Sequence, residues 1–375
     1  MGEIITEYKE TVDSDCTLPI LTSYKTEGVI LQEEHFGRKQ QHDITGYNIL
    51  PRNYCTYRNR SDGVDFTFNI NKCCDKGIIS KFYPVFSGNN SDVFFLSLVL
   101  NNSEEVVHEI AYTCTGTGQK VLSFLDLQKM KVRVPGFDEQ KKIAAYFDDL
   151  DHLITLHQRK CEDTKKLKKY MLQKMFPQNG SKVPEIRFKG FTDDWEQRKV
   201  GDITKELSEY AKLNSGLPLL TSARTGLMYQ SDYRGNSTTD NENTLFSIVP
   251  LNACTYRHMS DDSTFHINVN TLEKGLVSKE YPVFVENESD LRFVVQYINS
   301  SDSFTKFCTE QKKGGTRTRL YYKTLCEYKM LIPSLNEQHI IADYFDNLDY
   351  LITLHQNKCE ELKKIKKYML QNMFV

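Results

Sequence analysis

Two arginines lie at matching places in two parts of this chain. Arg58 follows a Cys-Thr-Tyr sequence, and Arg257 follows the same three residues. A guanidinium group can donate two parallel hydrogen bonds to a guanine base or to a phosphate. Each arginine alone is more often a solvated surface charge. Because the position is repeated, we take the two as the first candidates for a nucleic-acid contact.

A glycine-rich stretch also recurs, over residues 115–120 and residues 312–319. Glycine lets the backbone approach a ligand closely, and Thr, Gln and Arg side chains suit phosphates and base edges. An ordinary β-turn explains either stretch alone equally well, but the recurrence favours the DNA contact. The other DNA-binding residues that we predict, repeated cations included, are Lys25, Lys81, Thr115, Gly116, Gln119, Lys120, Arg224, Lys279, Thr316, Arg317 and Arg319.

The sequence offers no recognisable catalytic or metal-binding pattern. It contains no GxxxxGK[ST] phosphate loop, no Asn-Pro-Pro-aromatic methyltransferase motif and no CxxC. The nine histidines form no HxxxH pair, and the ten cysteines include recurring ones, such as Cys55 with Cys254 and Cys161 with Cys359. A free cysteine behaves as a small buried apolar residue. We therefore predict a non-catalytic chain that binds no metal or cofactor itself.

Length and composition indicate more than one globular domain. The chain has 375 residues, 39% of them hydrophobic, and no apolar run long enough to span a bilayer. Without a signal-peptide pattern at the start, we expect a cytoplasmic protein. The formal net charge is only −2, whereas proteins that bind DNA tightly by themselves are usually basic. DNA contact should therefore be confined to one face of each domain, with partner subunits supplying further phosphate contacts.

The elements that must position these residues are two long helical segments, 138–176 and 336–375. Residues 139–176 and 337–374 are identical at 28 of 38 positions and contain neither Pro nor Gly. Acidic residues gather in the first half of each segment and lysines in the second, which favours antiparallel pairing. Heptad spacing predicts a coiled-coil seam. The predicted seam residues are Ile143, Phe147, Leu150, Ile154, His157, Leu167, Met171, Ile341, Phe345, Leu348, Ile352, His355, Leu362, Ile365 and Met369.

Two of these seam positions are histidines, His157 and His355. A packed polar pair that fixes the helix register is a better interpretation than a catalytic or metal-binding role. The predicted fold is of the mixed α+β class, with two pseudo-symmetric α/β domains joined by a pair of long antiparallel helices. The predicted domains are 1–137 and 200–335, with residues 177–199 as a linker.

The helical segments, with the shared core written YFDDLDHLITLHQRKCE and YFDNLDYLITLHQNKCE, resemble those of the specificity subunit of type I restriction–modification enzymes. The resemblance implies two target recognition domains, each binding half of a bipartite site in double-stranded DNA, and helices that set the spacer. It also implies two modification subunits that use S-adenosylmethionine, and restriction subunits that use ATP and Mg²⁺. Residues 182–195 resemble the family's segment that leads into a recognition domain.

One departure from the family concerns the first domain. Met1 aligns with Val200, so this domain has no counterpart to residues 177–199. This predicts a shortened or recombined allele. Two other interpretations stay open: a coiled-coil adaptor without DNA binding, and a decoy that occupies modification subunits without productive DNA recognition.

Overall fold

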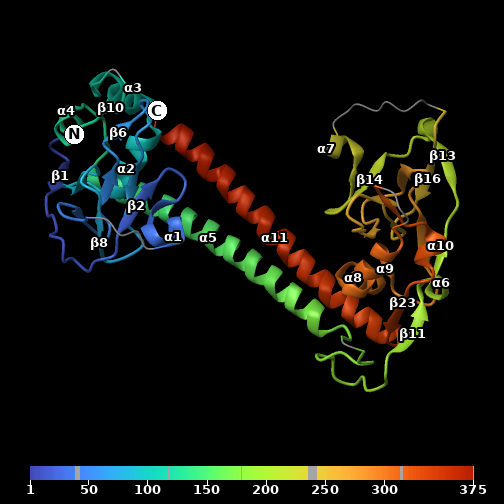
Figure 1. The fold of residues 1–375 in the computed structure, drawn as a ribbon. Coiled ribbons are helices and arrows are strands. Elements are labelled where there is room, and N and C mark those ends of the chain that lie inside the picture. The colour runs from blue at the N-terminus through green and yellow to red at the C-terminus, as the bar shows by residue number, and fades with distance from the viewer. Residues whose placement is uncertain (39–42, 117, 179, 235–242, 313–315, 375) are drawn as a thin grey trace. The chain divides into compact units, whose positions relative to one another are not determined.

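The computed structural model describes residues 1–38, 43–116, 118–178, 180–234, 243–312 and 316–374. By its internal contacts the chain divides into two compact units (Figure 1). Unit 1 consists of Met1–Gln158 with Gln356–Val375, and unit 2 consists of Arg159–His355. The helices α5 (Phe137–Lys174) and α11 (Leu335–Met373) each contribute one half to either unit. Both units contain helices and strands, so the predicted mixed class is confirmed.

Unit 1 is built around a four-stranded antiparallel sheet in the order β1-β9-β5-β7, with the smaller pairs β2-β3, β4-β8 and β10-β6 beside it. Alternate residues of β5 and its neighbours are apolar, and Tyr57, Phe68 and Phe86 are fully buried. The strands are β1 (Ile5–Tyr8), β2 (Leu21–Tyr24), β3 (Gly28–Leu31), β4 (Asn48–Pro51), β5 (Cys55–Tyr57), β6 (Arg60–Ser61), β7 (Phe68–Ile70), β8 (Lys76–Ile79), β9 (Val85–Gly88) and β10 (Lys120–Val121). The shorter helices are α1 (Gln32–Phe36), α2 (Val93–Asn102), α3 (Glu104–Thr113) and α4 (Phe124–Lys129).

Unit 2 repeats this plan. Its four-stranded sheet has the order β12-β21-β17-β19, and β13-β16-β20, β14-β15, β18-β22 and β11-β23 form smaller sheets. The strands are β11 (Glu196–Lys199), β12 (Thr204–Glu206), β13 (Tyr210–Lys212), β14 (Leu220–Ala223), β15 (Gly226–Tyr229), β16 (Leu245–Val249), β17 (Cys254–Thr255), β18 (Met259–Ser260), β19 (Asn268–Val269), β20 (Gly275–Ser278), β21 (Val283–Glu286), β22 (Thr318–Arg319) and β23 (Lys329–Ile332). The helical elements are α6 (Val200–Ile203), η1 (Leu213–Ser215), α7 (Gln230–Arg234), α8 (Leu291–Ser300), α9 (Asp302–Glu310) and α10 (Tyr322–Leu325).

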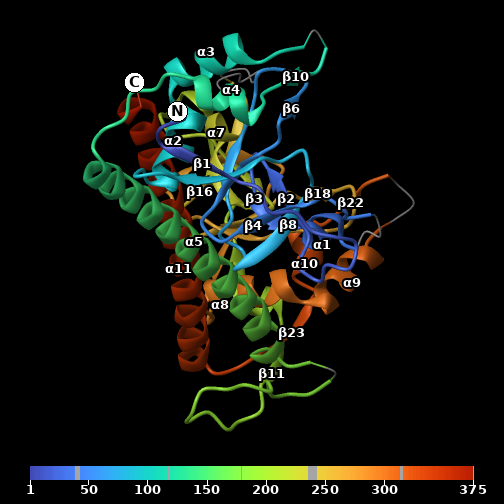
Figure 2. The ribbon, with the colours of Figure 1, turned by 90° about the vertical axis from the view of Figure 1, so that its left-hand side faces the viewer.

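Within unit 1, the first half of α5 and the last half of α11 lie side by side (Figures 1 and 2). The rings of Phe147 and Phe374 are 5.9 Å apart, and the Lys366 ammonium lies 2.5 Å from the Asp151 carboxylate. As the residue number rises along α5 it falls along α11, so the two segments run in opposite directions. The antiparallel pairing predicted from charge is confirmed in this unit.

Unit 2 contains the same contacts with the two helices exchanged. Phe345 stacks on Phe176 at 5.8 Å, and Lys168 lies 2.7 Å from Asp349. Each of these residues stands 198 positions away from its counterpart in unit 1. Each unit is therefore completed by its own helix beginning and by the end of the other repeat's helix.

The predicted seam is wrong at two equivalent positions. Leu167 and Ile365 are 45% and 37% exposed. Counting in alternating steps of three and four from Phe147 leads through Cys161, which is buried, to Lys168 instead of Leu167. Lys168 and Lys366 occupy the seam positions because their ammonium groups reach Asp349 and Asp151. The register histidines His157 and His355 stay a prediction.

A glutamine ties the start of each long helix to its domain. In unit 1 the Gln140 carbonyl accepts hydrogen bonds from the Ser91 hydroxyl and the Asp92 amide, and its amide group donates to Pro135 O at 2.9 Å. In unit 2 Gln338 accepts from the Asp290 amide at 3.0 Å and donates to Pro333 O at 2.9 Å. Buried polar groups need such partners, so the helix direction relative to its domain is fixed at this point.

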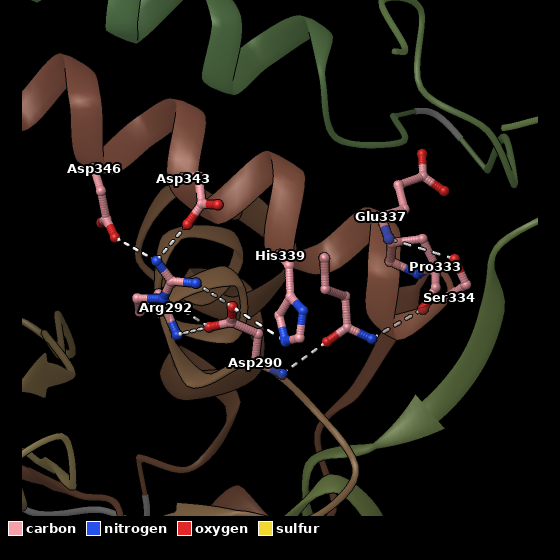
Figure 3. Close-up of polar contacts among 9 residues, drawn as sticks. Asp290, Arg292, Pro333, Ser334, Glu337, His339, Asp343 and Asp346 are labelled. Atoms are coloured by element: carbon pink, nitrogen blue, oxygen red, sulfur yellow. Dashed lines mark hydrogen bonds and ion pairs between the residues drawn. The ribbon is translucent and has the colours of Figure 1, made fainter. Parts of the chain in front are cut away.

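Unit 2 adds an ionic cluster to this junction (Figure 3). The Arg292 guanidinium on α8 lies 2.7 Å from Asp290 and Asp343 and 2.9 Å from Asp346. Burial raises the pKa of Asp346, and Arg292 opposes that rise. In unit 1 the position of Arg292 is held by Phe94, and Lys72 pairs with Asp148 instead. The two units thus neutralise equivalent helix carboxylates with cations from different elements.

Candidate nucleic-acid interface

A polar hollow of about 340 Å³ opens on unit 2 beside the β14–β15 hairpin. Two of the predicted cations, Arg224 and Arg257, line it. Arg224 stands in the hairpin turn, where the chain reverses between β14 and β15, and Arg257 follows β17. The two arginines are 33 positions apart in the sequence, and the fold brings them to one surface. The remaining lining residues are Ser222, Ala223, Thr225, Tyr233, Met259, Ser260, Asp261, Thr264, Phe265 and His266.

Arg224 is paired with a half-exposed carboxylate beside this hollow. Its guanidinium lies 2.5 Å from the Asp262 carboxylate, which also accepts from the Ser260 hydroxyl at 2.7 Å and the Thr264 amide at 3.0 Å. These hydrogen bonds, that of Ser260 first, hold the pKa of Asp262 well below its usual range. Asp262 is therefore a permanent anion that orients Arg224.

The second predicted cluster approaches the same turn from the glycine-rich stretch. Strand β22 pairs with β18, which sets Arg319 opposite Met259, and the Arg317 guanidinium lies 2.7 Å from Asp261. Thr316 is exposed beside them. Lys313, Gly314 and Gly315 lie outside the described residues.

Arg257 differs from its neighbours because it forms no hydrogen bond or ion pair with any residue that the structure describes. The adjacent residues Tyr256 and His258 are both buried, so the alternation of side chains directs Arg257 to solvent. The backbone next to Arg257 is held by a hydrogen bond, in which His258 O accepts from Leu320 N at 2.9 Å. Burial lowers the pKa of His258, and Arg319 and Arg257 add to this effect. An exposed guanidinium without a described partner can bind an anion or a base edge without losing an existing contact.

Unit 1 presents the equivalent arginine in the same way. Arg58 is exposed and follows the buried Tyr57, and it has no ion pair or hydrogen bond in the described part of the chain. Lys25, the counterpart of Arg224, lies 2.5 Å from Asp65 and lines a hollow of about 600 Å³. That hollow does not include Arg58. The structure therefore groups the predicted cations of unit 2 more closely than those of unit 1.

The glycine-rich stretch of unit 1 forms a tight turn. Thr115 and Val121 exchange backbone hydrogen bonds at 2.9 and 3.0 Å, and Lys120 pairs with Ser61 across β10 and β6. Gly116 has φ +103, and a Cβ there would lie 2.4 Å from Gln119 O, so only glycine fits. Gln119 donates to Asp62 at 3.4 Å, as Arg317 does to Asp261 in unit 2. Thr117 lies outside the described residues.

Lys81 and Lys279 stand on the loops that follow β8 and β20, outside the two hollows. Their ammonium groups lie 5.8 Å from the Phe82 ring centroid and 5.7 Å from that of Tyr210. Sequence reasoning missed Arg60, whose guanidinium lies 4.6 Å from the Phe82 ring, and the hollow-lining Tyr233. The repeat does not reveal Arg60, because Met259 replaces it in the second copy. Its place two residues after Arg58, at the start of β6, was the available signal.

This geometry defines a class of protein: a duplicated domain that carries a cationic polar surface and is joined to long helices. Comparison with known families gives the same result. The family model described as the type I restriction modification DNA specificity domain matches residues 45–165 and 262–364. These matches cover more than half of the chain, which therefore belongs to this family.

Individual relatives agree with the family assignment. A protein of Methanocaldococcus jannaschii named as the type I restriction enzyme MjaX specificity subunit is 25% identical over 284 residues, which is 67% of this chain and 60% of that protein. The MjaVIII specificity subunit of the same organism is 22% identical over 279 residues, 68% of this chain and 64% of that protein. The chain thus matches less than two thirds of either relative's length.

A solved structure shares the fold. The S subunit of a type I restriction–modification system from M. genitalium superposes with a TM-score of 0.58 at 12% identity, covering 100% of this chain and 94% of that one. At this identity the likeness concerns the fold alone. None of the described helices is both long and apolar enough to cross a membrane.

Proposed function

We propose that this chain is the non-catalytic DNA-recognition subunit of a type I restriction–modification complex, in which each unit reads one half of a bipartite site. The observation that carries the proposal is the placement of Arg58 and Arg257. Both are exposed, both lack a described partner, and both occupy the same position in two domains of the same plan. The residues around them differ between the units, as two readers of different half-sites require.

The other cations of the surface can join this contact at little cost. Lys25, Arg224 and Arg317 form ion pairs whose partners are about half exposed or more. Such surface pairs contribute about 0–1 kcal/mol, so a phosphate can replace the carboxylate. The near-neutral chain then offers local positive charge to the DNA on these surfaces. Modification subunits with S-adenosylmethionine, and restriction subunits with ATP and Mg²⁺, supply methylation and cleavage in this proposal.

Coexpression with modification subunits tests the function directly. Sequencing of methylated bases in the host DNA should reveal one motif made of two defined half-sites and an undefined spacer. Methylation without such a motif, or no methylation by an assembled complex, contradicts the proposal. An assembled complex that methylates no defined site would favour the decoy or the coiled-coil adaptor, each of which binds modification subunits without productive DNA recognition.

Replacing Arg257 by alanine should weaken binding to DNA carrying the second half-site by about 1–3 kcal/mol, because a bidentate base contact is lost. Arg257→Lys keeps the charge but lacks the planar fork of the guanidinium, so it should recover only part of the lost affinity. The measurement is a titration of the assembled complex with labelled duplexes at fixed salt. Lys306→Ala on α9, an exposed cation outside the hollow, is the matched control. Equal weakening on random DNA would show a phosphate contact instead of base recognition.

Inserting seven residues after Gln158 and seven after Gln356 should lengthen the spacer and leave both half-sites unchanged. These two points correspond to each other in the repeat and lie at the boundary of the two units, so the contacts within each unit are kept. Seven residues add about 10.5 Å of helix, close to three base pairs. Methylation-site sequencing is the readout. Insertion in one helix only, the mismatched control, should abolish methylation because the seam loses its register. If the double insertion changed the half-site bases, the helices would contribute to base recognition and not to the spacing alone.

A further inference from the structure

Residues 182–199 cover one face of unit 2. The Arg187 guanidinium binds the Glu337 carboxylate through two hydrogen bonds of 2.8 Å, and the Phe188 ring meets Tyr344 edge-on at 5.9 Å. Farther along, β11 adds an antiparallel strand to β23. Under this cover Glu337 is 1% exposed, and Ile341, Met330 and Ile332 are buried. The segment thus supplies a charge and an aromatic ring to the beginning of α11, and a paired strand to β23, which precedes that helix.

Unit 1 presents the same face, and none of the residues that the structure describes covers it in this way. The two domains correspond residue by residue there, since Met1 N donates to Met130 O as Val200 N does to Tyr328 O. Glu139, the counterpart of the buried Glu337, is exposed. Tyr146, the counterpart of Tyr344, is 40% exposed. The face therefore keeps its carboxylate and its ring but shows both to solvent.

The strand edge and the apolar floor of this face are open as well. Lys131–Val134, which corresponds to β23, forms no strand with any described residue. Val132, Val134 and Ile143 are only partly buried, whereas their counterparts in unit 2 are buried. Unpaired backbone N–H and C=O groups along an extended segment are a template for an added strand. Glu139, Tyr146 and the stretch Lys131–Val134 correspond to the residues that the segment contacts in unit 2.

We propose that this face of unit 1, made of Lys131–Val134, Glu139, Ile143 and Tyr146, binds an extended peptide segment with the chemistry of residues 182–199. The arginine of that segment pairs with Glu139, the aromatic residue after it packs on Tyr146, and its last residues add a strand to Lys131–Val134. Unit 2 is the template, because there the equivalent groups make these contacts. Glu139 supplies the charge that selects an arginine, and its exposure keeps it available.

A fluorescently labelled peptide of residues 182–199, titrated into the full chain, tests the proposal. Anisotropy should show saturable binding of one peptide per chain. The change Glu139→Gln in the chain should weaken binding by about tenfold or more, because a bidentate charge-assisted pair is lost, and Arg187→Ala in the peptide should do the same. Hydrogen exchange should slow at the amides of residues 131–134 when the peptide is bound.

Asp138→Asn provides the matched control. Asp138 is an exposed carboxylate next to Glu139 that pairs with Lys141, and its neutralisation should leave peptide binding unchanged. Three results would overturn the proposal: no binding, binding that Glu139→Gln does not alter, and slowed exchange at residues 329–332 in place of 131–134. A chain that dimerises in the absence of peptide, with the dimer dissociated by peptide, would also overturn it, since a second copy would then fill the face.

Discussion

Replacing Arg187 by alanine should lower the free energy of unfolding of unit 2 by about 3–5 kcal/mol. The Glu337 side chain is 1% exposed, and both of its carboxylate oxygens accept from the Arg187 guanidinium, which is itself 14% exposed. Removing the arginine leaves a buried carboxylate without its partner, which costs far more than a surface ion pair contributes. Urea denaturation measures the loss of unfolding free energy. Hydrogen exchange in residues 329–345 shows whether the loss is located at the start of α11.

The partner residue provides the control. Glu337→Gln combined with Arg187→Ala removes the buried charge together with its partner, so the double variant should recover part of the lost stability. Glu139→Gln, the same change at the exposed counterpart, should alter stability by less than about 0.5 kcal/mol. If Arg187→Ala also cost less than about 1 kcal/mol, the pair would not stabilise the start of α11.

Replacing Phe374 by alanine should destabilise unit 1 by about 3–5 kcal/mol, although the residue is far along the chain from the first domain. Its ring is 7% exposed and lies 6.0 Å from Phe95 and 5.9 Å from Phe147. Faster hydrogen exchange should appear in β1, β9 and α2, while the core strands of unit 2 keep their protection.

Phe176→Ala is the matched change for unit 2. Phe176 packs on Phe293 and Phe345 at 5.7 and 5.8 Å, so its loss should accelerate exchange in β21 and α8 and spare unit 1. If Phe374→Ala affected unit 2, or if Phe176→Ala affected unit 1, the assignment of helix ends to units would be wrong.

The helices were the most predictable part of this chain. A sequence of 38 residues without Pro or Gly, with apolar residues at heptad spacing and opposite charges in its two halves, leaves few alternatives to an antiparallel pair. The prediction failed at Leu167 and Ile365 because it followed hydrophobicity and passed over the lysines. Lys168 and Lys366 take the seam because long side chains can bury their methylene groups and still reach an anion.

The candidate interface was predictable in its residues but not in its grouping. The repeated Arg58 and Arg257 stood out in the sequence, and the fold leaves both exposed beside buried neighbours. Nothing local in the sequence indicated that Arg224 would pair with Asp262, or that Arg317 would pair with Asp261. The β14–β15 hairpin carries the first arginine to its partner, and the pairing of β18 with β22 carries the second. The roles of Arg187 and Glu337 were missed for the same reason, since 150 residues separate them.

The exchange of helix ends between the units has a consequence for synthesis on the ribosome. The first domain emerges early, but Cys359, Leu362 and Phe374 of its core follow only after all of unit 2 has been made. At about 5–20 residues per second, that interval lasts roughly 10–40 s. During this time the apolar face of the first half of α5 has no helix partner, so the nascent chain should be a client for chaperones until the last turns of α11 are translated.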